Sequence, residues 1–136
     1  MLRVRLALSA LTALAIISLA GCGGDTAGRL TVSGTVLFKG EPLDQGSIEF
    51  IPHPGVKTQS GAMITNGHFS IPADKGLEPG MYTVKISSIE APAPTDQPGG
   101  LPGKDPKERI PAKYNVKSTL TQEVKKGDNK FEFKLD

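Results

Sequence analysis

Alternating apolar and polar residues recur in short segments from residue 30 to the last residue printed. In residues 30–38 the apolar Leu30, Val32, Val36 and Phe38 share one parity. Successive side chains of a strand point to opposite faces, so this alternation predicts a strand that buries one face. The same reasoning predicts strands at six further segments, which are residues 47–52, 61–64, 68–71, 81–87, 118–124 and 130–136.

Turn signals separate these predicted strands. Asn66-Gly67 lies between two short apolar runs, and a type I′ hairpin turn needs positive φ at both of its central residues. Gly34 interrupts the buried side of the first strand, which predicts a bulge or close approach of another backbone. Glycine and proline are frequent, at 16 and 11 residues, and no long helical periodicity appears. The sequence therefore predicts an all-β fold, a single seven-stranded Ig-like β-sandwich over residues 30–136.

The first 21 residues follow a different pattern. Arg3 and Arg5 are the only charged residues before Asp25, and residues 6–20 form an uncharged, mostly apolar run. A basic start followed by such a run is typical of a secretory signal peptide. The run is shorter than the roughly 20 apolar residues that cross a bilayer as a helix. We therefore expect residues 1–21 to be a cleaved signal peptide.

The end of this run, Leu19-Ala20-Gly21-Cys22, resembles the bacterial lipobox, in which an aliphatic and two small residues precede a cysteine. In that family a dedicated peptidase cuts before the cysteine, whose sulfur then carries a diacylglyceryl group. The resemblance implies that Cys22 is the lipid attachment site and that palmitate or a similar acyl chain anchors the protein in a bilayer. It implies a place in the bacterial cell envelope, on the periplasmic or cell-surface side.

Two further expectations concern this region. The glycine-rich residues 22–29 are predicted to be a flexible tether between the lipid and the domain. Ser18-Leu19-Ala20 also fits an ordinary signal peptidase, and a cut after Ala20 would release a soluble protein with a free thiol. Both cleavage hypotheses remain open from the residues alone.

The charge of the mature chain narrows the class of partner. The full sequence has 16 basic and 14 acidic residues, and removing Arg3 and Arg5 with the signal peptide leaves 14 of each. A chain with zero net charge has no implied basic face, so we expect no nucleic acid partner. Cys22 is the only cysteine, which excludes an internal disulfide and, without a nearby histidine, makes a thiolate metal site improbable.

Three motifs between residues 30 and 89 are similar to those of the carboxypeptidase regulatory-like domain family. They are the turn Gly40-Glu41-Pro42-Leu43, the hairpin Asn66-Gly67-His68-Phe69, and the segment of residues 77–84, Leu-Glu-Pro-Gly-Met-Tyr-Thr-Val. The resemblance implies a transthyretin-like, seven-stranded β-sandwich that serves as a non-catalytic module. Pro79-Gly80 forces a sharp corner, and we expect Tyr82 to bury its ring and bond its hydroxyl near that corner.

No residue pattern predicts catalysis, a cofactor or a metal. His53 and His68, the only histidines, lack the i, i+2 or i, i+4 partner of a metal motif. Glu49, Glu123 and Glu132 are expected on outward strand faces among lysines. No nucleophile elbow or phosphate-binding loop appears. The sequence predicts a membrane-anchored envelope lipoprotein that carries a non-enzymatic binding or structural module, with an envelope protein or a glycan as partner.

The proline-rich segment of residues 90–113 holds six prolines. Loops of this length are usually functional or solvated insertions, and proline-rich extended chain is a form that partner proteins recognise. We expect Ile110 and Tyr114, at its end, to dock on the sandwich. The alternative function is a glycan-binding module of the envelope. Such modules use exposed aromatic platforms, and here only Tyr114 is expected to be exposed.

Overall fold

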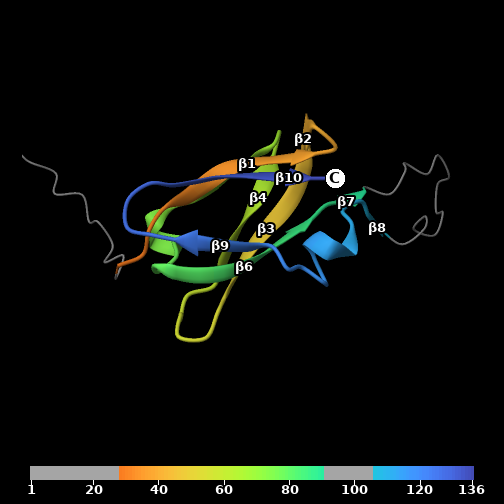
Figure 1. The fold of residues 1–136 in the computed structure, drawn as a ribbon. Coiled ribbons are helices and arrows are strands. Elements are labelled where there is room, and N and C mark those ends of the chain that lie inside the picture. Colours follow the sequence, from red (N-terminus) through yellow and green to blue (C-terminus); the bar gives the residue numbers. More distant parts are fainter. Residues whose placement is uncertain (1–27, 91–105) are drawn as a thin grey trace, which may run out of the picture.

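The computed structural model describes residues 28–90 and 106–136 (Figure 1). The predicted signal peptide and Cys22 therefore lie outside the described residues. Ten strands are present within these two ranges: β1 (Val32–Phe38), β2 (Glu41–Pro42), β3 (Gln45–Pro52), β4 (Ser60–Thr65), β5 (His68–Ile71), β6 (Gly80–Ser87), β7 (Ile89–Glu90), β8 (Lys107–Glu108), β9 (Thr121–Val124) and β10 (Asn129–Leu135). The only helices in the described ranges are the 3-10 turns η1 (Ala73–Lys75) and η2 (Ala112–Tyr114).

Seven of the strands follow one another in one hydrogen-bonded order, β10-β1-β5-β4-β3-β6-β9, and β2 adds to β1. The first and last of these in sequence, β1 and β10, are parallel, and the other pairs are antiparallel. The sheet is strongly curled (Figure 1). β4 and β5 pair only at Thr65 and His68, where the hairpin turns. The predicted all-β fold is confirmed, whereas its division into a two-sheet sandwich stays a prediction.

All seven predicted strand segments form strands. The first begins later than predicted, at Val32, because Leu30 instead makes an isolated bridge to Leu77. The sixth is shortened to β9, because the backbone of Leu120 and the hydroxyl of Ser118 bond to Val84 outside the regular ladder. The hairpin turn is as predicted, since Asn66 and Gly67 have φ values of 49° and 77°.

The inward face of each strand supplies the core. Phe50 on β3 lies at its centre, with ring centroids 6.1 Å from Phe69, 6.3 Å from Tyr82 and 6.5 Å from Phe133. These partners come from β5, β6 and β10. Phe50 therefore packs against both halves of the curled sheet, which are β10-β1-β5 and β4-β3-β6-β9. Burial of apolar area against this cluster is the main force that holds the halves together.

Gly34 allows two backbones to approach each other, as predicted. It is paired with Phe131 of β10 on one side and with Phe69 of β5 on the other. A Cβ atom at this position would overlap the carbonyl oxygen of Phe131 and lie 2.9 Å from the Phe69 ring. Any other residue would therefore separate β1 from one of its neighbours.

Tyr82 forms the expected corner. Its ring is fully buried, and its hydroxyl donates to the carbonyl oxygen of Glu78 at 2.9 Å. The Thr58 hydroxyl lies 2.8 Å from the Tyr82 hydroxyl and accepts the Glu78 backbone N–H at 2.8 Å. Burial raises the pKa of the Tyr82 phenol above its ordinary value of 10.0. The hydroxyl therefore fixes the loop before β6 while it remains protonated.

We expect Tyr82→Phe to lower the free energy of unfolding by about 1–2 kcal/mol, because it leaves the partly buried Glu78 carbonyl without its donor. A raised folded pKa means that the wild-type contribution is complete below about pH 10 and is lost as the pH rises further. Urea unfolding at neutral and alkaline pH measures both effects. Tyr114→Phe, at a half-exposed tyrosine, is the control and should change stability less; an equal loss would contradict the corner.

Candidate binding surface at the base of residues 91–105

A two-stranded ribbon joins the chain on both sides of residues 91–105. In it, Ile89 pairs with Glu108 and Glu90 pairs with Lys107 (Figure 1). Residues 106–113 of the predicted proline-rich loop are therefore built into the fold as β8, a buried Ile110 and the start of η2. The prolines alone did not indicate this, because the contacts that hold this part are made by its charged residues.

Arg109 binds three elements together at this end of the domain. Its Nε and Nη2 donate to Ser88 Oγ at 3.1 and 2.7 Å, and Nη2 forms an ion pair with Asp44. Ser88 is 1% exposed, and its own hydroxyl donates to the carbonyl oxygen of Gln45 at 2.6 Å. The guanidinium beside Asp44 holds the pKa of that carboxyl below its ordinary value of 3.8.

Glu108 completes the network from the other side. Its Oε1 accepts the backbone N–H groups of Ser88 at 2.8 Å and Ile110 at 2.9 Å. The Arg109 backbone N–H donates to the Ser88 carbonyl oxygen at 2.8 Å. The two bonds to Ser88 join the residues just before residues 91–105 to those just after them, and the bond to Ile110 holds the Glu108 side chain in place. The network therefore fixes where both ends of that segment stand.

Ile110 and Tyr114 dock on the sheet, as predicted. Ile110 is 2% exposed and belongs to the core, and Tyr114 is half-buried against it. The buried side chain of Asn115 donates to the Ile110 carbonyl oxygen at 3.1 Å, which closes the turn around η2. Because Tyr114 is half-buried, it presents less of its ring than the sequence suggested.

A shallow groove of about 320 Å³ lies beside the ribbon. Its apolar walls are Met63 of β4 and Ile89 of β7, whose exposed fractions are 72% and 55%. Its floor is formed by Gln45, Gly46, Ser47 and Ser87. Met63 lies on the outer face of β4 because its neighbour Ile64 points into the core. The groove itself could not be predicted, because it needs the turn of β7 away from β6.

The ribbon and the first described residues lie at opposite ends of the sheet (Figure 1). Leu30 bridges Leu77, close to the start of β6, whereas the ribbon follows the end of β6 at Ser87. An eight-residue strand is about 26 Å long at roughly 3.3 Å per residue. The groove therefore stands about one strand length from the residue at which the described chain begins.

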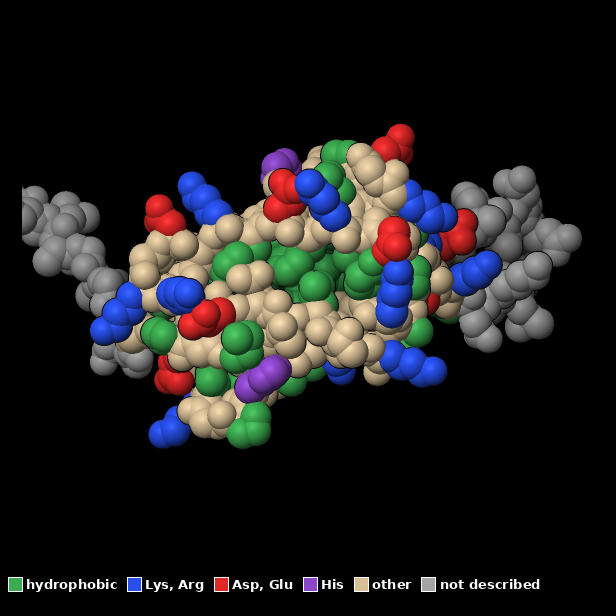
Figure 2. All heavy atoms as spheres, in the orientation of Figure 1, with side chains coloured by type: hydrophobic (Ala, Val, Ile, Leu, Met, Phe, Trp, Pro, Cys, Tyr) green, Lys and Arg blue, Asp and Glu red, His purple; other side chains and the backbone are tan. Residues whose placement is uncertain are grey.

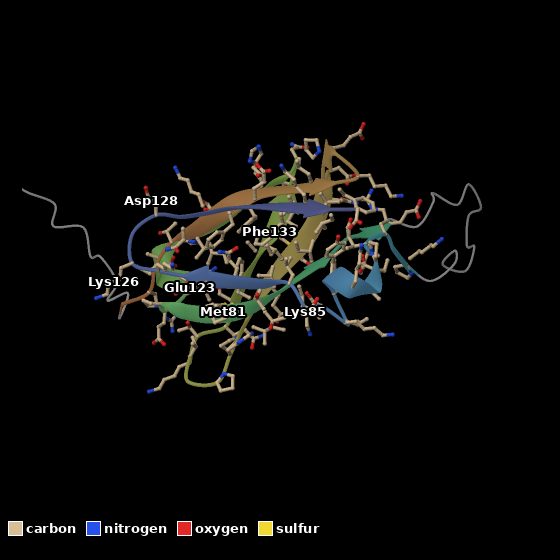
Figure 3. The ribbon with its side chains drawn as sticks, in the orientation of Figure 1. Met81, Lys85, Glu123, Lys126, Asp128 and Phe133 are labelled. Carbon is tan, nitrogen blue, oxygen red and sulfur yellow. The ribbon has the colours of Figure 1, made fainter. Side chains whose placement is uncertain are left out.

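The histidines and glutamates singled out in the sequence do not gather in one place. His53 Nε2 lies 2.9 Å from Thr83 Oγ1, and His68 is exposed at the start of β5. Glu123 and Glu132 pair with neighbouring lysines at 3.1 and 2.7 Å, as expected of outward charges (Figure 3). Within residues 28–90 and 106–136, no three His, Cys, Asp or Glu side chains are grouped as metal ligands.

Comparison with family models, with curated proteins and with solved structures found no match to this chain. The carboxypeptidase regulatory-like resemblance therefore rests on the motifs in the sequence. None of the helices in the part of the chain that the structure describes is long and apolar enough to cross a bilayer.

We expect Asp44→Asn to make the free energy of unfolding of the domain depend less on pH in the acid range. Because Arg109 depresses the folded pKa of Asp44, the ion pair stabilises the fold above about pH 4 and this contribution is lost as the pH falls below that value. The variant should be less stable than wild type at neutral pH and converge with it as the pH falls through the lowered folded pKa of Asp44. Urea midpoints across this range give the difference. Asp74→Asn, at an exposed aspartate outside the network, should run parallel to wild type; the same convergence there would contradict the assignment.

Proposed function

We propose that this protein is an envelope lipoprotein, anchored in a bilayer through a lipidated Cys22, whose folded part is a non-catalytic binding module for another envelope protein. The lipobox resemblance of residues 19–22 supports the anchor. Two or more acyl chains on one cysteine hold a protein stably at a membrane, whereas a single chain does not. The tether of residues 22–29 would then lead to the end of the sheet where Leu30 pairs with Leu77.

A transthyretin-like sandwich is the fold that we propose for the module. The halves β10-β1-β5 and β4-β3-β6-β9 enclose one core, and among the described residues the hairpin at Thr65 and His68 is their only ladder connection. Two sheets packed face to face over one core are what defines a sandwich. The curled sheet therefore supports the family resemblance without the help of the three motifs.

The network around Arg109 is the observation that carries the binding proposal. Ser88 is buried, and burying polar groups is costly unless they are paired. Glu108 and Arg109 pair with Ser88 across the two ends of residues 91–105. The fold thus fixes the residues on both sides of residues 91–105, and an apolar groove lies beside them at the end of the sheet remote from Leu30. Rigid elements that hold a loop at one end of a β-sandwich are a common way to build a binding surface.

A non-catalytic role agrees with the titratable groups. The pKa values of Asp44, Lys134 and Tyr82 are each shifted by a structural contact, namely Arg109, Glu132 and burial at the corner. None of these three groups lines the groove between Met63 and Ile89. No specific observation favours the glycan alternative, because all five phenylalanines and both tyrosines are buried or half-buried and offer no exposed platform.

Cys22→Ser should abolish incorporation of labelled palmitate and move the protein out of the membrane fraction, because serine cannot form the thioether. Metabolic labelling followed by fractionation measures both. Gly24→Ser introduces the same residue two positions later and should keep label and location. Label that survives in Cys22→Ser, or a wild-type protein with a free Cys22 thiol, would exclude the anchor.

Photo-methionine can test which end of the domain meets a partner, since the chain has only Met1, Met63 and Met81. Met81 lies at the start of β6, at the end remote from the groove. In intact cells, Met81→Leu should keep cross-links from Met63 to one envelope protein, and Met63→Leu should lose them. Equal cross-linking from both methionines, or none from Met63, would count against a partner at the groove.

A further inference from the structure

β10 ends the hydrogen-bonded order, and among the described residues it pairs with β1 alone. The Lys39 N–H donates to the Leu135 carbonyl oxygen at 2.8 Å, so the backbone groups of Leu135 point toward β1. This direction alternates along a strand. The N–H and C=O groups of Lys130, Glu132 and Lys134 therefore point away from β1, and the whole length of β10 offers an edge to which a strand can add.

Apolar surface lies beside this edge. Figure 2 shows a strip of apolar side chains in the gap between β9 and β10, and Figure 3 places Phe133 beside it. Phe131 of β10 and Leu120, which precedes β9, are only half-buried. β9 and β10 are consecutive in sequence, yet they stand at opposite ends of the strand order and do not pair. A strand added along β10 would cover part of this strip.

The charges on the outer face of β10 alternate in sign. They are Lys130, Glu132, Lys134 and Asp136, and all four residues are exposed. Lysines on an edge strand commonly prevent strand addition. Here an acid follows each lysine, so a strand with the reverse order of charges would be attracted. In an antiparallel arrangement, a second β10 has that reverse order.

The register of such a pair is restricted by the backbone. Only even-numbered residues have outward N–H and C=O groups, so even residues must face even residues. With Glu132 on the two-fold axis, Glu132 faces itself and Lys130 faces Lys134, which sets like charges opposite each other. With Phe133 on the axis, Glu132 faces Lys134 and Lys130 faces Asp136, each twice by symmetry. Opposite charges directly across an antiparallel pair stabilise it, and like charges destabilise it.

We propose that a second copy of this chain docks on β10, antiparallel, with Phe133 of both copies on the two-fold axis. The contact is isologous, so it closes at a dimer. Within one copy Lys134 already lies 2.7 Å from Glu132, and in the dimer these two side chains exchange partners. On the inner face Phe131 of one copy meets Leu135 of the other, which covers the half-buried Phe131 ring. The dimer does not depend on the lipid, so it can fail without affecting the proposed anchor.

Charge reversal at two exposed positions tests both the dimer and its register. The full-length protein is purified in detergent, and its dimerisation is measured by sedimentation. Glu132→Lys and Lys134→Glu should each weaken dimerisation about tenfold, because each replaces two attractive contacts by two repulsive ones. The double variant E132K/K134E should restore it. Glu123→Lys makes the same change on the exposed face of β9 and should have no effect.

The charge-reversal variants distinguish the register with Phe133 on the two-fold axis from the two registers next to it. With Glu132 on the axis, Lys134→Glu would strengthen the dimer; with Phe131 on the axis, Lys130 faces Glu132 and the double variant would not recover. Carbodiimide cross-linking of a mixture of ¹⁴N and ¹⁵N protein provides a second readout, with mixed-isotope links expected between Lys134 and Glu132. A monomer at every concentration, a dimer unaffected by the single reversals, or links from β10 to another segment of the same chain would overturn the proposal.

Discussion

The approach of β1 to β10 at Gly34 is the constraint on which the rest of the structure depends. The two strands come from opposite ends of the folded part, so closing this contact orders a chain of about a hundred residues, at an entropic cost that grows slowly with loop length. Two backbones and the Phe69 ring converge where Gly34 has no side chain. Only with β10 at this distance do Phe131 and Phe133 reach Phe50. The aromatic cluster and the parallel pair therefore form together or not at all.

The same closure determines which surfaces remain open. Once β1 lies between β5 and β10, the order of strands ends at β10 on one side and at β9 on the other. The turn at residues 125–128 is held by Asn129, whose side chain bonds Lys125 N–H and the carbonyl oxygens of Lys125 and Gly127. A turn fixed in this way brings the two strands near each other without pairing them. An edge rich in unpaired backbone groups is thus a consequence of how the core is built.

Local patterns predicted the parts of this structure that depend on local geometry. Alternation placed Tyr82, Val84 and Ile86 on one face, and Asn66-Gly67 gave the hairpin because positive φ is a property of the residues themselves. Pairing between distant segments has no such signal. The ion pair of Arg109 joins residues 65 positions apart, and the parallel pair of β1 and β10 spans the folded part. The groove beside Met63 has no such signal either, because Met63, Ser47 and Ser87 come together only through the pairing of β4, β3 and β6.

The polar network at the base of residues 91–105 fixes the position of the residues on both sides of that segment more than it stabilises the fold. Of its side chains only Ser88 is buried, whereas Asp44 is exposed and Arg109 is partly exposed, and an ion pair in contact with solvent contributes little to stability. A well-packed apolar contact tolerates small sliding, whereas Arg109 must meet Ser88 Oγ with two nitrogens at 3.1 and 2.7 Å. Directional bonds of this kind admit one arrangement. The domain therefore holds its core by apolar burial and specifies, by hydrogen bonds, where the proline-rich chain leaves and returns.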